Sequence, residues 1–239
     1  MAGTMVHLLV AEKLYQRICN GRLVYAAPHL DVPEEAYFVA GNICPDGIMA
    51  REGYQREMKL HTHFRDGIPD GSFEAPGMVE LFEERMKAFW QEHLQDEGEK
   101  PGLYLGYITH MMTDERFILD ERPKFFERIA VLGLTDHDKE TFVQFGRETD
   151  LVDFRLIRDF PEITRAKGLL EEVTPYEIRG MLGEKELTAS REWILQYFFG
   201  KEYYIEETKY LLYDSMVAFA EQVTEEILER LQKENYLKK

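Results

Sequence analysis

Apolar side chains recur every three or four residues along most of the chain, the spacing that places them on one face of an α-helix. The first segment with this pattern predicts a helix from Thr4, its N-cap, to about Cys19. His7 falls on the apolar stripe of this helix, which also contains Val10, Ala11, Leu14 and Ile18. A single histidine at such a position is most simply a core residue, and a metal ligand is the alternative.

Other segments carry the same helical pattern. They predict a short helix from Pro33 into Gly41, a helix from Met78 to about Asp96, a helix from Pro123 to Gly133, a helix that starts near Thr135, and a last helix from about Ile205 to Lys233. The sequence shows no sustained alternation of apolar and polar residues, so few or no strands are expected. The fold class predicted for residues 1–239 is therefore all-α, as a single multi-helix domain.

The apolar stripe of the last predicted helix has two interpretations. It consists of Leu212, Met216, Phe219, Val223, Ile227 and Leu231, at spacings of three and four residues. Such a stripe usually packs in the core of the same chain. The alternative is the seam of a dimer that forms through the C-terminal helix.

A strongly apolar stretch runs from Pro101 to Phe117 and contains His110 and Asp114. Because these two residues are four positions apart, a helix stacks their side chains one turn apart on one face. Zinc accepts histidine nitrogen and aspartate oxygen at similar distances of roughly 2 Å, so the pair could share one cation. The stretch is too apolar to lie on the surface, and a buried cation there needs further ligands from elsewhere in the chain.

Three further candidate ligands lie between residues 46 and 63. Asp46 stands in the sequence CPDG, where a turn aspartate bonded to its own backbone is the simpler interpretation. His61 and His63 are two positions apart, and an extended segment would send their side chains to opposite sides, so that at most one points inward. The run from Asp66 to Gly77 is rich in glycine, proline and aspartate and is expected to form a long surface loop.

The composition excludes some classes of partner. The chain has a formal net charge of -16, which repels nucleic-acid phosphates and anionic lipid, so nucleic-acid binding is not expected. Its two cysteines, Cys19 and Cys44, have no metal-ligand spacing and are expected to be reduced thiols. No apolar run reaches the roughly 18 residues of a transmembrane segment, and the short apolar start lacks the features of a secretory signal. We therefore expect a cytoplasmic protein without a transmembrane segment.

The candidate ligands occur in an order that resembles the zinc-dependent phospholipase C family, which is related to the P1-type nucleases. The matching pieces are the early helical His7, the CPDG around Asp46, the THFRD around His63, and the YLGYITHMMTDERF that contains His110 and Asp114. The resemblance covers roughly residues 1–126. It implies an all-α fold with up to three zinc ions in a cleft, and the hydrolysis of phosphate diesters.

The resemblance also implies a role for each matching residue. Asp46, His63, His110 and Asp114 would bind one zinc ion. Asp114 would bridge to a second ion that also uses His7. His61 is an extra histidine and a weaker candidate ligand.

The site of a third ion departs from the family pattern. Where the family has a histidine ten residues after the helical histidine, this chain has Asp120, and the only later histidine is His137. An aspartate ligand is harder than a histidine and favours Mg, Mn or Fe. Asp120 is therefore a candidate ligand, His137 is a weaker one, and one to three ions are expected.

The predicted function is that of a metal-dependent phosphodiester hydrolase. Zinc lowers the pKa of a bound water from about 15.7 to roughly 7, and Asp46 would be the catalytic residue that orients this water and takes its proton. The expected substrate is a phosphoester of a lipid or a small molecule. Two alternatives are an HD-type phosphohydrolase, suggested by the adjacent His137 and Asp138, and a non-catalytic metal-bound helical protein that binds a partner.

Overall fold

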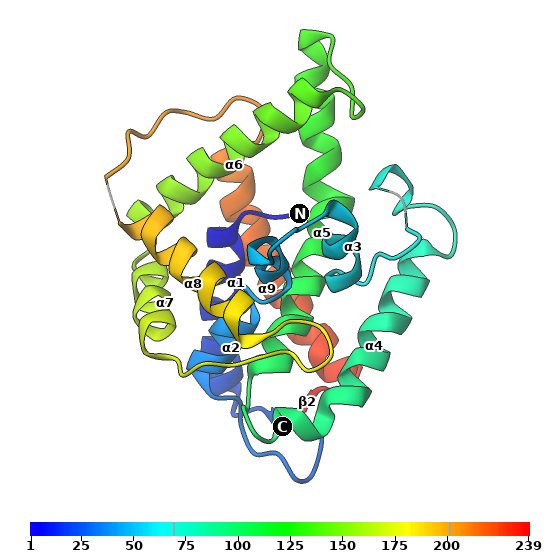
Figure 1. Ribbon diagram of the computed structural model, residues 1–239, viewed down its shortest axis with the longest axis vertical. Helices are drawn as coiled ribbons and strands as arrows, with labels where there is room; N and C mark the ends of the chain where they lie inside the picture. The colour runs from blue at the N-terminus through cyan, green and yellow to red at the C-terminus, as the bar shows by residue number, and fades with distance from the viewer. Residues whose placement is uncertain (69, 201) are drawn as a thin grey trace.

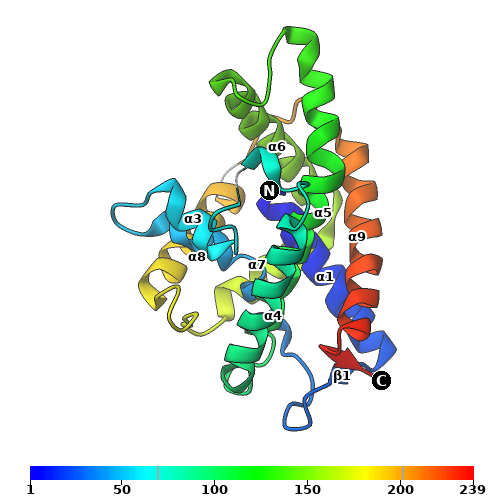
Figure 2. The same ribbon diagram turned by 90° about the vertical axis from the view of Figure 1, so that its right-hand side faces the viewer.

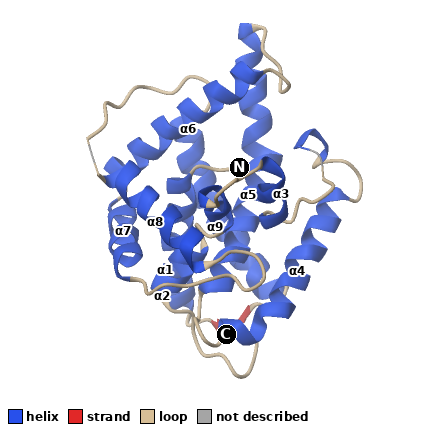
Figure 3. Cartoon of the chain, viewed as in Figure 1, coloured by secondary structure: helices blue, strands red, loops and turns tan. Residues whose placement is uncertain are grey.

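The computed structural model describes residues 1–68, 70–200 and 202–239 of the chain and consists mainly of helices (Figure 3). The α-helices are α1 (Thr4–Gly21), α2 (Glu35–Gly41), α3 (Arg56–Thr62), α4 (Met78–Glu97), α5 (Leu103–Ile129), α6 (Lys139–Asp159), α7 (Pro161–Glu172), α8 (Glu184–Phe199) and α9 (Tyr213–Lys233). Short 3-10 helices are η1 (Pro45–Ala50), η2 (Asp70–Ser72) and η3 (Ala130–Leu132). Strands β1 (Val24–Tyr25) and β2 (Leu237–Lys238) pair antiparallel, with Val24 opposite Lys238. The prediction of a single all-α domain is confirmed.

Helix α5 lies at the centre of the fold and contacts α1, α2, α4 and α9. It runs through the middle of the molecule in Figure 1, and Figure 2 shows α1 and α9 side by side along it. Because these helices cover it, every residue from Leu103 to Glu115 is buried. Within the described part of the chain, no helix is both long and apolar enough to cross a membrane.

Two glycines allow α2 and α5 to cross with their backbones in contact. A Cβ added to Gly41 would overlap the carbonyl oxygen of Leu103, and a Cβ added to Gly106 would overlap the carbonyl oxygen of Phe38. Each added Cβ would also lie 2.9 Å from the Cα of the other glycine. The close crossing brings Asn42, which follows α2, against the middle of α5.

The largest differences between the predicted and the observed helix boundaries lie at Pro123 and at the start of the last helix, and smaller ones lie at the starts of α2 and α6. Pro123 is expected to start a new helix, yet α5 continues through it to Ile129. The missing proline N–H costs one hydrogen bond, and the burial of Phe125 and Ile129 offsets that loss. The last helix is expected from about Ile205, but α9 begins at Tyr213.

Glu148 on α6 explains why α9 begins late. Its buried carboxylate accepts hydrogen bonds from the backbone N–H groups of Lys209, Tyr210 and Leu211, at 2.8, 2.9 and 3.0 Å. The segment ahead of α9 therefore satisfies its N–H groups on a neighbouring helix instead of in a helical turn of its own.

The predicted surface loop after Asp66 is partly buried. Ile68 and Phe73 have exposed fractions of 1% and 2%, and η2 lies between them. Pro69, which belongs to the same predicted loop, lies outside the described residues. Apolar side chains at both ends thus attach this segment to the core.

The apolar stripe of α9 packs within the same chain. Its members Met216, Phe219, Val223, Ile227 and Leu231 are buried, and α9 contacts α1 and α5. Of the two interpretations of this stripe, the core interpretation agrees with the structure. Leu212 precedes the helix and is 38% exposed.

Glu97 joins the end of α4 to the start of α5 and gives the stability a pH dependence. Its buried carboxylate accepts hydrogen bonds from the Tyr25 hydroxyl and from the backbone N–H groups of Gly102 and Tyr104. Burial raises the pKa of Glu97 from 4.5 to about 7, although these hydrogen bonds act in the opposite direction. Between pH 4.5 and about 7 the folded chain therefore binds a proton that the unfolded chain has released.

The sign of this effect leads to a first prediction. Because the folded state binds more protons in this interval, the Glu97 contribution to the free energy of unfolding should fall by about 3 kcal/mol as the pH rises from about 4.5 to 7. Urea unfolding of the wild type and of Glu97→Gln at several pH values would measure it, because the variant lacks the titrating group. The prediction would be contradicted if the difference in the free energy of unfolding between the wild type and the variant stays constant across this pH interval.

Candidate metal centre

Five side chains that are distant in sequence converge in the interior. They are His7 on α1, Asp46 on η1, His63 directly after α3, and His110 and Asp114 on α5. Four of them have exposed fractions of 3% or less, whereas the Asp46 side chain is 18% exposed. The structure thus brings together all five residues expected to hold two ions, with Asp46 at the rim.

Three of the distances between the ligand atoms of four residues are close to those of a tetrahedral site. Ligands about 2.0–2.1 Å from zinc at the corners of a tetrahedron lie about 3.3–3.4 Å apart. His63 Nε2 lies 3.3 Å from Asp46 Oδ1 and 3.7 Å from Asp114 Oδ2. His110 Nε2 lies 3.5 Å from the same Asp114 oxygen. These four atoms are therefore candidates to hold one cation.

A second position for a cation lies at the other oxygen of Asp114. Asp114 Oδ1 is 3.3 Å from His7 Nε2 and accepts a hydrogen bond of 2.8 Å from the Ala2 backbone N–H. The His7 and His110 rings are stacked, with centroids 3.7 Å apart. The ligand atoms of His7, His110 and Asp114 lie within 4.8 Å of one another. Because His110 Nε2 has one lone pair for one cation, a second ion would use His7 and the bridging Asp114.

Backbone carbonyl groups determine which ring nitrogen of two histidines faces the cluster. Nδ1 of His63 lies 2.9 Å from the Lys59 carbonyl oxygen, and Nδ1 of His110 lies 2.8 Å from the Asn42 carbonyl oxygen. A carbonyl oxygen only accepts, so both Nδ1 atoms carry the proton and both Nε2 atoms turn a lone pair to the cluster. Among the described residues these Nε2 atoms have no hydrogen-bond partner. Metal-binding histidines are usually oriented in this way.

Hydrogen bonds between elements hold two of the ligands in place. The Tyr107 hydroxyl on α5 donates to the Thr62 carbonyl oxygen, and the Thr62 hydroxyl donates to the Pro45 carbonyl oxygen at 2.9 Å. This relay connects α5 to the residue before His63 and to the residue before Asp46. The two ligands outside α1 and α5 are therefore tied to the central helix.

The start of α1 is held by an acidic side chain from α6. Thr4, the predicted N-cap, is the first helical residue, and Gly3 occupies the N-cap position without a side-chain cap. The buried carboxylate of Asp153 lies against the first turn of α1, within electrostatic reach of its backbone N–H groups. A Cβ on Gly3 would overlap this carboxylate. The contact fixes the first turn of α1 and, one turn later, the position of His7.

Burial keeps two histidines of the cluster neutral. It lowers the pKa of His7 from 6.5 to about 4, and the adjacent His110 adds to this shift. Burial also lowers the pKa of His63, although Asp46 acts in the opposite direction. Since neutral imidazole is the form that binds a cation, His7 and His63 are ready as ligands at neutral pH.

Both carboxylates of the cluster are ionised. Burial raises the pKa of Asp46, but the Lys59 ammonium group and the nearby histidines outweigh it and hold the pKa well below 3.8. Burial likewise raises the pKa of Asp114, but the adjacent His110 and His7 outweigh it and hold the pKa well below 3.8. Two negative charges, that of the buried Asp114 and that of Asp46 at the rim, beside neutral imidazoles favour the binding of a divalent cation.

Sequence reasoning misses Lys59, whose Nζ lies 2.6 Å from Asp46 Oδ1. Lys59 precedes His63 by four residues, so the two share a face where the chain is helical. The sequence analysis predicts an extended segment here, so it does not place Lys59 on the same side as His63 and misses the contact of Lys59 with Asp46. A cation bound at Asp46 would repel the ammonium group, which could then interact with an anionic ligand.

His61 lies outside the cluster, and the physical reason differs from the predicted one. The segment Arg56–Thr62 is helical and not extended. His61 lies on the outer face of this helix, where its Nδ1 is 2.7 Å from Asp66 Oδ2 and its side chain is 61% exposed. His63 points inward because it directly follows the end of α3, whereas His61 lies on the outer face of that helix. The alternation of side chains along a strand is not the reason.

The structure does not bring Asp120 and His137 to the cluster. Asp120 is ten residues beyond His110 on α5, which a helix places about 15 Å further along, and its carboxylate pairs with Arg116 at 2.7 Å. The His137 side chain is 88% exposed and lies 3.6 Å from Asp136. The expectation that these residues complete a third ion site is therefore corrected.

An apolar pocket of about 480 Å³ opens beside the cluster. It is lined by Thr4, Asp46, Met49, Ala50, Ala189, Ser190, Trp193 and Ile194. A small cavity lined by His7 and His110 shares Thr4, Asp46 and Ile194 with this pocket. The pocket therefore leads toward the ligands, and Asp46 is the ligand that borders it.

Comparisons with known protein families, curated proteins and solved structures found no match to this chain. The case for a function therefore depends on the site itself. Its possible ligands are three imidazoles and two carboxylates, a set that suits zinc and also Mn and Fe.

Proposed function

We propose that the protein is a metal-dependent phosphodiester hydrolase of the zinc-dependent phospholipase C type. The observation that supports this most is the convergence of five ligand side chains from four elements, with Nε2 of His63 and of His110 turned inward. Such a group of polar atoms is costly to bury without a cation, because the atoms lose their hydrogen bonds to water. Zinc is the proposed cation, because it accepts both histidine nitrogen and aspartate oxygen as ligands.

In this proposal the side chains of the site have different tasks. His63, His110 and Asp114 hold the cation, and Asp46 completes the site from its rim. When bound, the cation would supply Lewis acidity and lower the pKa of water in the site from about 15.7 toward roughly 7. Asp46 would orient the attacking water and accept its proton, since it alone of the five ligands borders the large pocket. Lys59 would contact a phosphoryl oxygen.

The pocket beside Asp46 indicates which kind of phosphoester the site would accept. Its walls include Met49 and Ile194, together with Trp193, which is 50% exposed. Apolar walls of this kind bind the hydrocarbon or aromatic part of a ligand. The proposed substrate is therefore a phosphoester of a lipid or of an apolar small molecule, and the net charge of -16 disfavours nucleic acid.

Hydrolysis of bis(p-nitrophenyl) phosphate tests the proposal. Protein purified without chelator should contain at least one divalent cation per chain and release p-nitrophenolate. Chelation should lower the rate at least about 100-fold, and added Zn should restore it, because the activation of water depends on the cation. Full metal occupancy together with no hydrolysis of any diester would refute the hydrolase and support the non-catalytic alternative.

That alternative is a structural cation that joins α1, η1, α3 and α5. The near-complete burial of four ligands is the observation that favours it. The HD-type alternative receives less support from the structure. His137 is exposed, and Asp138 Oδ2 accepts hydrogen bonds from the Thr135 backbone N–H and hydroxyl.

A further inference from the structure

We propose that Arg56, Arg65 and Arg122 form an anion-binding subsite beside the metal centre. All three residues line one pocket of about 200 Å³, whose other walls are formed by Met1, Phe126, Phe142 and Phe145. In a chain with a formal net charge of -16, three cationic side chains around one small pocket reverse the local charge. Guanidinium groups bind phosphate and carboxylate oxygens through paired N–H donors.

The subsite lies on the same helix as two of the metal ligands, further along α5. Each step of four residues turns a side chain by about 40° about the helix axis, so Arg122 is turned by about 80° from Asp114. Arg122 is eight residues beyond Asp114, or about 12 Å along the helix axis. A ligand that occupies the metal centre could therefore reach this subsite with its other end.

Arg65 brings a second guanidinium group to the same region. It follows His63 by two residues, and its exposed fraction is 4%. The charges of Arg122 and Asp114 both act on its guanidinium group, in opposite directions. The two guanidinium groups thus lie within electrostatic range of each other and of a metal ligand.

Aromatic rings restrain two of the guanidinium groups. The Arg65 guanidinium lies 5.5 Å from the centre of the Phe73 ring, and that of Arg122 lies 5.2 Å from the Phe126 ring. A restrained guanidinium loses less conformational entropy when it binds an anion. All three arginines also interact with other residues of the chain, so a bound anion would share their N–H donors with those partners.

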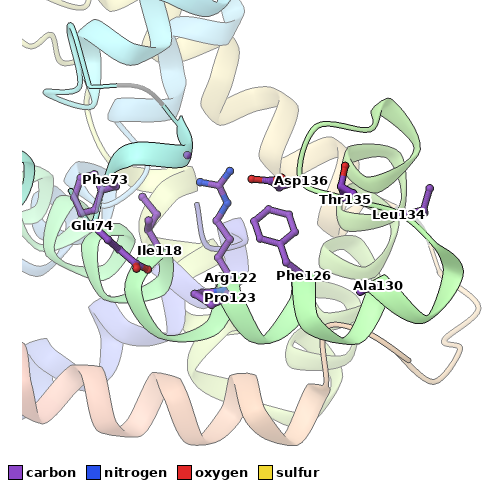
Figure 4. A pocket seen from close by; sticks show the side chains of 11 residues that line it. Phe73, Glu74, Ile118, Arg122, Pro123, Phe126, Ala130, Leu134, Thr135 and Asp136 are labelled. Carbon is purple, nitrogen blue, oxygen red and sulfur yellow. The ribbon is translucent and has the colours of Figure 1, made fainter.

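Arg122 stands between two pockets. Figure 4 shows its guanidinium group extending from α5 between Asp136 and the segment that carries Phe73 and Glu74. The pocket in this view has a volume of about 480 Å³, and Arg122 and Phe126 line it as well as the smaller pocket. The space around Arg122 is therefore larger than a single phosphate group requires.

The ligand chemistry that fits is a terminal phosphate or carboxylate group of the substrate. This part of the inference rests on the proposed hydrolase function, because it places the scissile phosphoester at the metal centre. A substrate with a second anionic group would be bound at both ends. The arginines would not increase the affinity for a substrate whose other end is neutral.

Titration of inorganic phosphate into the chelator-treated full-length chain tests the subsite without any activity assay. Calorimetry at low ionic strength should show saturable binding with one phosphate per chain. Arg122→Gln and Arg56→Gln should each weaken it at least about tenfold, because hydrogen bonds to charged groups are among the stronger ones. Arg147→Gln is the matched control: Arg147 is an exposed arginine on α6 that pairs with Glu206, and its loss should leave phosphate binding unchanged.

Two outcomes of this titration would overturn the subsite. One is the absence of saturable phosphate binding by the wild type. The other is equal binding by the wild type and by all three variants, which would place the phosphate elsewhere on the protein. Circular dichroism of each variant verifies that the fold is retained, and Arg56, which is exposed, is the substitution least able to disturb the core.

A matched pair of chromogenic diesters connects the subsite to the proposed reaction. Thymidine 3′-(p-nitrophenyl phosphate) with a 5′-phosphate should have a KM about tenfold lower than the same ester without it, and Arg122→Gln should abolish the difference. If neither ester is hydrolysed but phosphate binding depends on the arginines, the hydrolase proposal fails and the subsite stands. If both esters are hydrolysed equally and phosphate does not bind, the subsite fails and the hydrolase proposal stands.

Discussion

His63→Ala should remove the bound cation, whereas His61→Ala, two residues away, should leave the metal content unchanged. His63 presents Nε2 to the cluster, 3.3 Å from Asp46 Oδ1, while His61 lies on the outer face of α3. Loss of a residue that merely orients a ligand already costs about 10- to 100-fold in metal affinity, so loss of a ligand should cost at least about 100-fold. Metal analysis by mass spectrometry after dialysis against buffer would measure the difference.

The comparison has internal controls. Both substitutions remove an imidazole from the same short segment, so a general loss of structure would show in circular dichroism of both variants. Asp120→Ala and His137→Ala should also retain the metal, because neither side chain reaches the cluster. Equal metal content in His63→Ala and His61→Ala would exclude the proposed centre.

Gly106→Ala should destabilise the protein by about 3 kcal/mol or more. The added methyl group would overlap the Phe38 carbonyl oxygen and lie 2.9 Å from the Cα of Gly41. Overpacking a core usually costs about 1–3 kcal/mol, and here the obstacle is backbone, which moves less easily than a side chain. Urea unfolding followed by circular dichroism would measure the change.

Gly146→Ala is the matched control for this substitution. Gly146 also lies inside a helix, α6, but nothing lies within 4 Å of the position of its Cβ. Alanine there should stabilise the protein by roughly 0.5–1 kcal/mol, because glycine inside a helix has a larger entropic cost. If Gly106→Ala and Gly146→Ala change the free energy of unfolding equally, α2 and α5 do not cross as closely as described.

The same crossing also matters for the site. Asn42 follows α2 directly, and its carbonyl oxygen accepts the Nδ1–H of His110 at 2.8 Å. The Thr109 hydroxyl donates to the Asn42 side chain at 2.9 Å. If the added methyl group of Gly106→Ala separates α2 from α5, His110 loses the acceptor that orients its ring, so any metal that the folded variant binds should be held more weakly.

Helical periodicity is enough to identify the pair of candidate ligands on α5. His110 and Asp114 can be assigned to one helix face from their spacing, because the geometry of a helix depends on local backbone bonds alone. The stripe of α9 and the helix Met78–Glu97 follow from the same regularity. Periodicity did not predict the structure at Pro123. Buried residues before and after this proline stabilise α5, so the helix continues through a residue that usually interrupts one.

The order of residues along the chain is therefore enough to predict an all-α domain. The resemblance of their order and local sequence contexts to those of a known zinc-dependent family nominates His7, Asp46, His63, His110 and Asp114 as a set. Tertiary packing decides that these five side chains meet, that Asp120 and His137 do not join them, and that Lys59 and the arginines lie nearby. The reason is physical. Helical spacing is a property of neighbouring residues, whereas the convergence of separate elements depends on how close their backbones can approach, as Gly41 and Gly106 demonstrate.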